Sequence, residues 1–138
     1  MITASIADCM SRDFARIHPD MPVVKAVAKL MRHELLGGPV TDDDGRLLGW
    51  LSEQECLKVA IQVAYYNQRV ATVGDIMRHD VLSVRADMDP MALVQQMLGD
   101  KPKNYPVVDA GGRVLGVISR RHLLQHLDKL LQGRAQAA

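Results

Sequence analysis

The chain has 138 residues, 48% of them hydrophobic and 24% charged, and a formal net charge of +1. A chain of this length can bury a core without disulfides or metal ions, and a net charge near zero with few aromatic residues argues against a general nucleic-acid-binding surface. The two cysteines are isolated, and neither a signal-peptide pattern nor an apolar run of about 20 residues is present. We therefore expect a reduced, cytoplasmic protein that binds neither nucleic acid nor membrane.

The first half of the chain contains three patterns in succession. The segment IADCMSRD (residues 6–13) leads into a short extended run at residues 14–17. An amphipathic helix is predicted next, because apolar residues recur at intervals of three and four, at Val23, Val27, Leu30 and Met31. Residues 39–51, PVTDDDGRLLGWL, place two apolar runs around an Asp/Gly turn, which predicts a β-hairpin followed by a closing helix.

The second half repeats these patterns in the same order. The segment VGDIMRHD (residues 73–80) aligns with residues 6–13, and PVVDAGGRVLGVI (residues 106–118) aligns with the first hairpin. The offset is 67 residues throughout, and it holds without a gap from Asp8 as far as Ser52. A register kept over such a length indicates an internal repeat.

Each repeat has the pattern β-α-β-β-α, which is too small to bury its own sheet. We therefore expect an α+β (mixed α/β) fold in which the two repeats pack sheet to sheet about a pseudo-twofold axis. The predicted organisation is one module over residues 1–138, with repeat 1 at 6–60, a linker at 61–72, repeat 2 at 73–131 and a C-terminal tail at 132–138.

Both copies share the order D-x-M-x-x-D, extended run, helix and P-V-x-D-x-x-G-R-x-L-G-x-x-S. This order resembles the CBS domain, and residues 6–127 resemble a tandem CBS pair. The resemblance implies a non-catalytic regulatory module that dimerises into a disc and binds an adenosine nucleotide or adenosyl ligand between its repeats. It requires no cofactor, and AMP, ADP, ATP and S-adenosylmethionine all remain candidate regulatory ligands.

The ligand motif of that family, Ser/Thr-x-x-Asp, is altered in both copies. The Asp position holds Glu55 in the first copy and His122 in the second. Ser52 with Glu55 forms either a helix capping box or a ribose site. Ser119 is followed by basic residues, which a helix N-terminus disfavours. These side chains either bind a phosphate group or extend into solvent.

The resemblance implies two unequal clefts. The base side of the stronger cleft is predicted to comprise Val81, Leu82, Ser83, Tyr105, Pro106 and Val107. Its ribose and phosphate side is predicted to comprise Ser119, Arg120, Arg121 and His122. The weaker cleft is predicted to comprise Ile17, Gly38, Pro39, Val40, Ser52 and Glu55. Tyr105 is the best stacking candidate for a base, and its alternative is a core aromatic.

Other features suggest no chemistry of their own. We find no catalytic constellation, and we interpret His122 and His126 as solvent-facing, opposite a buried leucine face, and not as metal ligands. Cys9 and Cys56 are expected in the core.

We expect a homodimer formed by the helices around residues 58–71 and 121–131, and an unidentified regulated protein as partner. The alternative function is a ligand-independent dimeric interaction module with vestigial clefts.

Overall fold

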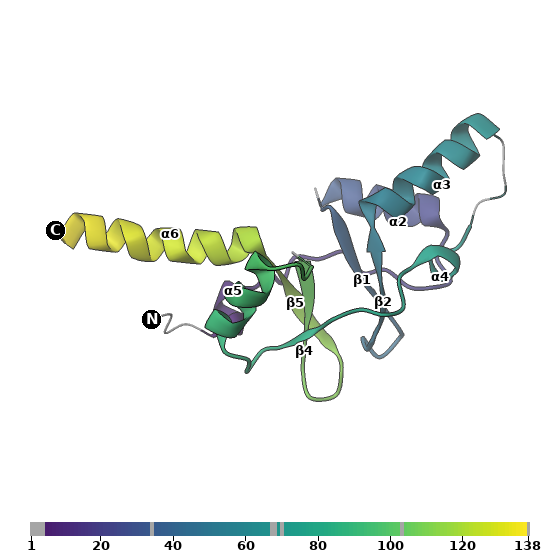
Figure 1. Cartoon of the computed structure of the whole chain (residues 1–138). Coiled ribbons are helices and arrows are strands. Elements are labelled where there is room, and N and C mark those ends of the chain that lie inside the picture. Colours follow the sequence, from purple (N-terminus) through teal and green to yellow (C-terminus); the bar gives the residue numbers. More distant parts are fainter. Residues whose placement is uncertain (1–4, 34, 67–68, 70, 103, 138) are drawn as a thin grey trace.

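A computed structural model describes residues 5–33, 35–66, 69, 71–102 and 104–137. The two halves of the chain fold into the same series of elements, except that the second half has one additional short strand. The first half contains α1 (Ile6–Cys9), α2 (Val23–Arg32), β1 (Gly37–Thr41), β2 (Leu47–Ser52) and α3 (Glu53–Tyr66). The second half contains α4 (Val73–Ile76), β3 (Val84–Arg85), α5 (Pro90–Leu98), β4 (Asn104–Val108), β5 (Val114–Ser119) and α6 (Arg120–Ala137). Figure 1 shows both halves.

Both predicted hairpins are confirmed. Strands β1 and β2 pair antiparallel, as do β4 and β5, and β3 adds a parallel strand beside β4. Each turn is closed by one aspartate: Asp42 Oδ1 accepts from the Arg46 N–H at 2.9 Å, and Asp109 Oδ1 accepts from the Arg113 N–H at 3.0 Å. The predicted extended runs are shorter than expected, because residues 14–17 contribute only a bridge from Ile17 to β1.

Main-chain hydrogen bonds between the halves confirm the pseudo-twofold axis. The hairpins stand side by side with their turns at the same end (Figure 1). The Leu47 N–H donates to the Gly112 carbonyl at 3.0 Å, and the Val114 N–H donates to the Gly45 carbonyl at 2.9 Å. The two donors are 67 residues apart in the sequence, and so are the two acceptors, so the two bonds are equivalent in the two repeats. The sequence repeat is therefore also a repeat in space.

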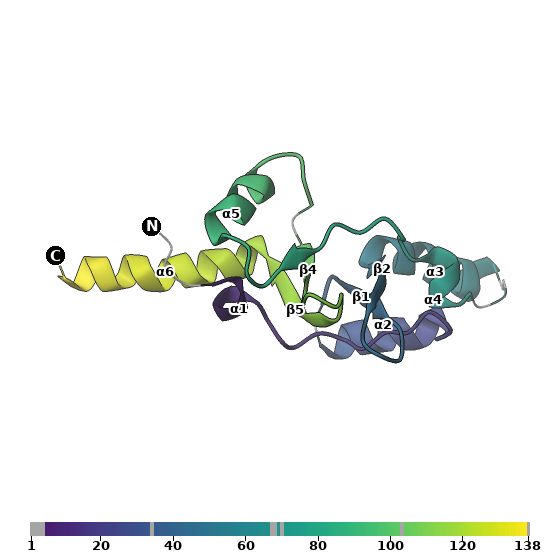
Figure 2. The ribbon, with the colours of Figure 1, turned by 90° about the horizontal axis from the view of Figure 1, so that it is seen from below.

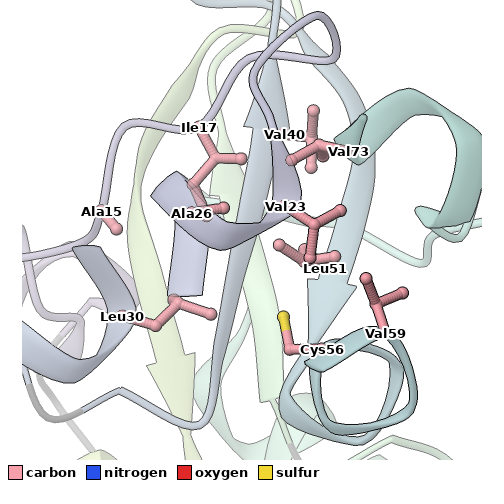
Figure 3. Packing of buried hydrophobic residues seen from close by; sticks show 10 residues of the cluster. All are labelled: Ala15, Ile17, Val23, Ala26, Leu30, Val40, Leu51, Cys56, Val59 and Val73. Carbon is pink, nitrogen blue, oxygen red and sulfur yellow. The ribbon is translucent and has the colours of Figure 1, made fainter. Parts of the chain in front are cut away.

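The N-terminal turn of each repeat packs in the core of the other repeat. The first core contains ten buried residues, among them Val73 of α4: Ala15, Ile17, Val23, Ala26, Leu30, Val40, Leu51, Cys56, Val59 and Val73 (Figure 3). The second core includes Ile6 and Cys9 of α1, which pack with β4, β5 and α6 residues. The predicted ranges 6–60 and 73–131 therefore follow the sequence repeat, whereas the two cores exchange α1 and α4.

Two glycines allow this exchange. The segment after α4 pairs with β2 through Arg78 and Trp50, whose N–H groups each donate to the other's carbonyl at 2.9 Å. A Cβ added at Gly49 in β2 would lie 2.6 Å from the Arg78 carbonyl oxygen. In the second half, a Cβ at Gly116 would lie 2.5 Å from the Ser11 carbonyl oxygen. Only a residue without a side chain fits at either crossing.

The helix α6 extends away from the second hairpin in both views (Figures 1 and 2). Its predicted buried leucine face is wrong for the single chain. Leu123 is buried, but Leu124 and Leu131 are 65% and 59% exposed. Cys9 and Cys56 are free and buried, as predicted.

Within the described residues, no helix is long and apolar enough to cross a membrane. Some predicted segments lie partly outside the described residues: residues 1–4 of the module, 34 of repeat 1, 67, 68 and 70 of the linker, 103 of repeat 2 and 138 of the tail.

Candidate functional site

Two neighbouring pockets lie between the repeats, and the end of one hairpin contributes to each. The Ser52 pocket has a volume of about 420 Å³ and is lined by Trp50, Ser52, Arg78, Asp80, Val81, Leu82, Pro102 and Asn104. The Ser119 pocket has a volume of about 380 Å³. Repeat 1 lines it with Leu35, Leu36, Gly37 and Trp50, and repeat 2 with Asn104, Val117, Ile118, Ser119, Arg120, Arg121 and His122.

The structure divides the predicted stronger cleft between these two pockets. Val81 and Leu82 lie beside Ser52, not beside Ser119. The exchange of α4 explains this correction, because Arg78 pairs with β2 and the chain then runs past the end of that strand at Ser52. The other pocket is lined by Ser119, Arg120, Arg121 and His122, together with Leu35 and Leu36, which precede β1.

Tyr105 is a core residue, so its prediction as the stacking residue is wrong. Its side chain is 1% exposed and packs in the second core. Within the described part of the chain, the hydroxyl has no hydrogen-bond partner, and burial raises the pKa of the phenol. The alternative interpretation, a core aromatic, is the correct one.

Most of the other predicted base-side residues are also buried. Pro106 and Val107 are buried, as are Ile17, Gly38, Pro39 and Val40 of the predicted weaker cleft. Ser83 is exposed but lines neither pocket. Ile17, Val40 and Val107 belong to the cores. The pockets are lined instead by the hairpin ends and by segments outside the hairpins.

Ser52 and Ser119 begin the closing helices in different ways. The Ser52 hydroxyl accepts from the Glu55 N–H at 3.3 Å, whereas the Glu55 carboxylate lies 3.6 Å from Lys58 Nζ, outside both pockets. The Ser52 half of the predicted capping box is therefore present, and Glu55 does not line a pocket as a ribose ligand would.

The second cap is reciprocal and uses an imidazole in place of a carboxylate. The Ser119 N–H donates to His122 Nδ1 at 3.0 Å, and the His122 N–H donates to the Ser119 hydroxyl at 3.3 Å. Nδ1 can accept only when it carries no proton, so the ring holds its proton on Nε2. Burial, followed by the charge of Arg121, lowers the pKa of His122 below its usual value.

The electrostatic character of the two pockets differs. The Ser52 pocket contains Arg78 together with the carboxylate of Asp80. The Ser119 pocket contains Arg120 and Arg121, and the described residues that line it include no carboxylate. An anionic group is therefore better accommodated in the Ser119 pocket.

Sequence reasoning missed two residues that line both pockets, Trp50 and Asn104. Trp50 occupies the position of Val117, and Asn104 occupies that of Gly37. The sequence did contain a signal for both residues. At the equivalent position of the other repeat, each is replaced by a smaller side chain, valine for Trp50 and glycine for Asn104. The prediction that His122 and His126 face solvent is wrong, because both residues are partly buried. No group of three metal-ligating side chains occurs in the described ranges.

A comparison with models of known sequence families identifies the family of this chain. The profile of the CBS domain matches residues 6–61 and again residues 73–129. The chain belongs to the CBS domain family. The two matches correspond to the two repeats, so the chain contains a tandem CBS pair.

Solved CBS pairs have the same fold. CBSX2 of Arabidopsis thaliana, solved in complex with AMP, is 24% identical, with 91% of this chain and 97% of that chain covered and a TM-score of 0.79. The CBS domain pair of protein MJ0100, solved with 5-methylthioadenosine and S-adenosyl-L-methionine, is 22% identical, with 90% and 99% covered and a TM-score of 0.75.

Several relatives are longer than this chain. Protein MJ1004 of Methanocaldococcus jannaschii is 26% identical, with 92% of this chain and 60% of that chain covered and a TM-score of 0.81. Among curated sequences, the chain spans 58% of MJ1004 and 22% of an inosine-5'-monophosphate dehydrogenase from the same organism. The activity of that enzyme therefore cannot be assigned to the segment that the two proteins share.

Proposed function

We propose that this CBS pair is a non-catalytic regulatory module that binds an adenosine nucleotide or adenosyl ligand in the Ser119 pocket. The observation that carries the proposal is the composition of that pocket, which combines two arginines and a serine hydroxyl with apolar walls. Its volume of about 380 Å³ is in the range of pockets for small ligands. CBSX2 with AMP and the MJ0100 pair with its adenosyl ligands support the choice of ligand class.

A phosphate group would reverse an unfavourable electrostatic arrangement. Arg120 and Arg121 stand in the first turn of α6, where the helix dipole favours negative charge. A bound anion would pair with these guanidinium groups and would also interact favourably with the helix N-terminus. AMP, ADP and ATP provide such an anion, while S-adenosylmethionine would use the apolar walls.

A thermal-shift experiment tests this function. Adenosine, AMP, ADP, ATP and S-adenosylmethionine are compared with GMP. A ligand at 100 times its dissociation constant should raise the free energy of unfolding by about 2.7 kcal/mol. A shift with one adenosyl compound and not with GMP is the expected result. The absence of any shift at millimolar concentration would contradict an adenosine sensor.

The exposed helices favour a second candidate function, a dimeric interaction module whose pockets are vestigial. On α3, Leu57 and Tyr65 are 62% and 81% exposed, and on α6, Leu124 is 65% exposed. Apolar surface of this kind marks protein interaction sites. We infer that it forms a homodimer in the cytoplasm, where free thiols persist, and contacts an unidentified regulated protein. Dimerisation without any ligand-induced shift would favour this candidate.

A further inference from the structure

The indole of Trp50 lies at the boundary of the two pockets and contributes to the walls of both. Its main chain is held on both sides of β2. It pairs with Pro39 in β1, and it exchanges two hydrogen bonds of 2.9 Å with Arg78. The direction of the side chain is therefore set by the sheet, and not by a loop that could rearrange.

The indole lies against Gly37, which also lines the Ser119 pocket. A Cβ built at Gly37 would be 2.9 Å from Trp50 Nε1 and 2.8 Å from the Leu51 carbonyl oxygen. Because Gly37 has no side chain, the indole ring can occupy this space. Repeat 2 has no such arrangement, because Val117 and Asn104 stand at the equivalent positions. The aromatic wall is a feature of one repeat only.

In the Ser119 pocket, this wall complements the cationic side. The indole and Val117 supply apolar surface, and Arg120 and Arg121 supply positive charge. An aromatic face together with paired guanidinium groups suits a molecule with a flat heterocycle at one end and a phosphate at the other. The Ser52 pocket has the same indole, but there Asp80 opposes an anion.

We propose that Trp50 is the base-stacking residue of the Ser119 pocket, supplied by repeat 1 to a site whose phosphate side belongs to repeat 2. This inference rests on the proposed function, which places the ligand in the Ser119 pocket. It adds the identity of the side chain that holds the purine. Trp50 takes the role that the sequence suggested for Tyr105. Both repeats are then required to bind a single nucleotide.

The test compares nucleotides with a ligand that lacks the base. Calorimetric titrations with AMP, GMP and ribose 5-phosphate are made on the unaltered protein, on Trp50→Val and on Trp50→Phe. Trp50→Val places valine at both equivalent positions, and Trp50→Phe retains a ring. Loss of a base–aromatic stack lowers affinity by roughly five- to a hundredfold. We expect that loss for AMP in Trp50→Val, a smaller loss in Trp50→Phe and a change below about twofold for ribose 5-phosphate.

A second measurement uses the unaltered protein and does not depend on how the variants fold. Trp50 is the only tryptophan, so fluorescence excited where tyrosine does not absorb reports on this ring alone. AMP should change the emission, with the same midpoint as in the titration, and ribose 5-phosphate should not.

The outcomes separate this inference from the proposed function. AMP binding that Trp50→Val leaves unchanged, or an equal loss for AMP and ribose 5-phosphate, overturns the role of Trp50 alone. GMP binding without AMP binding overturns the adenosine function, and the stacking role is then decided with GMP, since stacking tolerates any base. If none of the adenosyl compounds of the thermal-shift panel and no GMP binds the unaltered protein, both proposals are wrong.

Discussion

At the scale of single residues, the two helix caps show how one substitution changes the character of a site. Glu55 and His122 occupy equivalent positions in the repeats, but only His122 completes a reciprocal cap with its serine. The sequence offered a capping box at Ser52 and Glu55 as one of two alternatives, because the spacing fits that motif. It did not predict that an imidazole would accept a hydrogen bond. A histidine in the sequence can carry its proton on either ring nitrogen or on both, and only the geometry shows that Nδ1 is the acceptor.

The first prediction concerns Arg120 and Arg121. Changing both to alanine should lower AMP affinity by on the order of ten- to a thousandfold, since two charge-assisted contacts are lost. The melting temperature of the unliganded protein should stay equal or rise slightly, because like-signed charge leaves a helix N-terminus. Titration calorimetry and melting on both proteins check this, with Arg12→Ala as the control outside both pockets. Unchanged affinity for a ligand that binds would exclude the phosphate role.

The second prediction concerns pH. The pKa of folded His122 is lowered from 6.5, so as pH falls, the unfolded chain takes up the proton first. The contribution of the neutral cap to stability is therefore complete above the unfolded pKa and is lost as pH falls through the folded pKa. Urea denaturation across this window should show a decline that His122→Gln lacks, since glutamine accepts the same hydrogen bond without titrating. Equal declines in the two proteins would contradict this role of His122.

At the scale of elements, the hairpins and the repeat were predictable, but the partner of each extended run was not. The Asp/Gly turns and apolar runs determine the hairpins locally, through Gly45 and Gly112 at φ 83°. The same pattern occurs in both halves, so nothing in it distinguishes a run that joins its own hairpin from one that joins the opposite hairpin. The glycines at positions 49 and 116 carry the missing information about the partner of each run. A glycine is needed there because the backbone of the exchanged segment approaches closely.

The third prediction follows from these crossings. Gly49→Ala and Gly116→Ala should each destabilise the protein by about 1–3 kcal/mol, because the new Cβ meets a carbonyl oxygen of the exchanged segment. Gly133→Ala in α6 is the matched control, since nothing lies within 4 Å of a Cβ there, and alanine favours a helix by about 1 kcal/mol. Chemical denaturation measures all three variants. Equal stabilities for the crossing and control variants would refute the close approach.

At the scale of the whole molecule, the site is a joint product of the two repeats, and so is each core. The resemblance predicted the correct family, whereas the structure groups the cleft residues differently, because the predicted lining of each cleft was drawn from a single repeat. Trp50 and Asn104 went unnoticed for the same reason: they act across the pseudo-twofold axis. The exposed apolar residues on α3 and α6 belong to this scale too, because the proposed homodimer would cover them.

The fourth prediction concerns assembly. The protein should sediment as a homodimer at micromolar concentration, and Leu57→Glu combined with Leu124→Glu should produce a folded monomer. These leucines are equivalent in the two repeats, and both side chains are mostly exposed, so the charges should disrupt the interface and not the core. Leu48→Glu, on the hairpin, is the control and should remain dimeric. A monomeric unaltered protein would refute the interface.

The exchange of α1 and α4 also determines what the chain can do while the ribosome is still making it. The first core lacks Val73 until the second repeat has begun to emerge, and Ile6 has no core to enter until β4 and β5 are made. The first repeat is therefore incomplete when its own codons have been read, and the nascent first half keeps an apolar gap open to solvent. Synthesis must pass residue 118 before Ile6 can be buried in the core that contains Ile118, so a polypeptide released early would be recognised by the cell as unfolded.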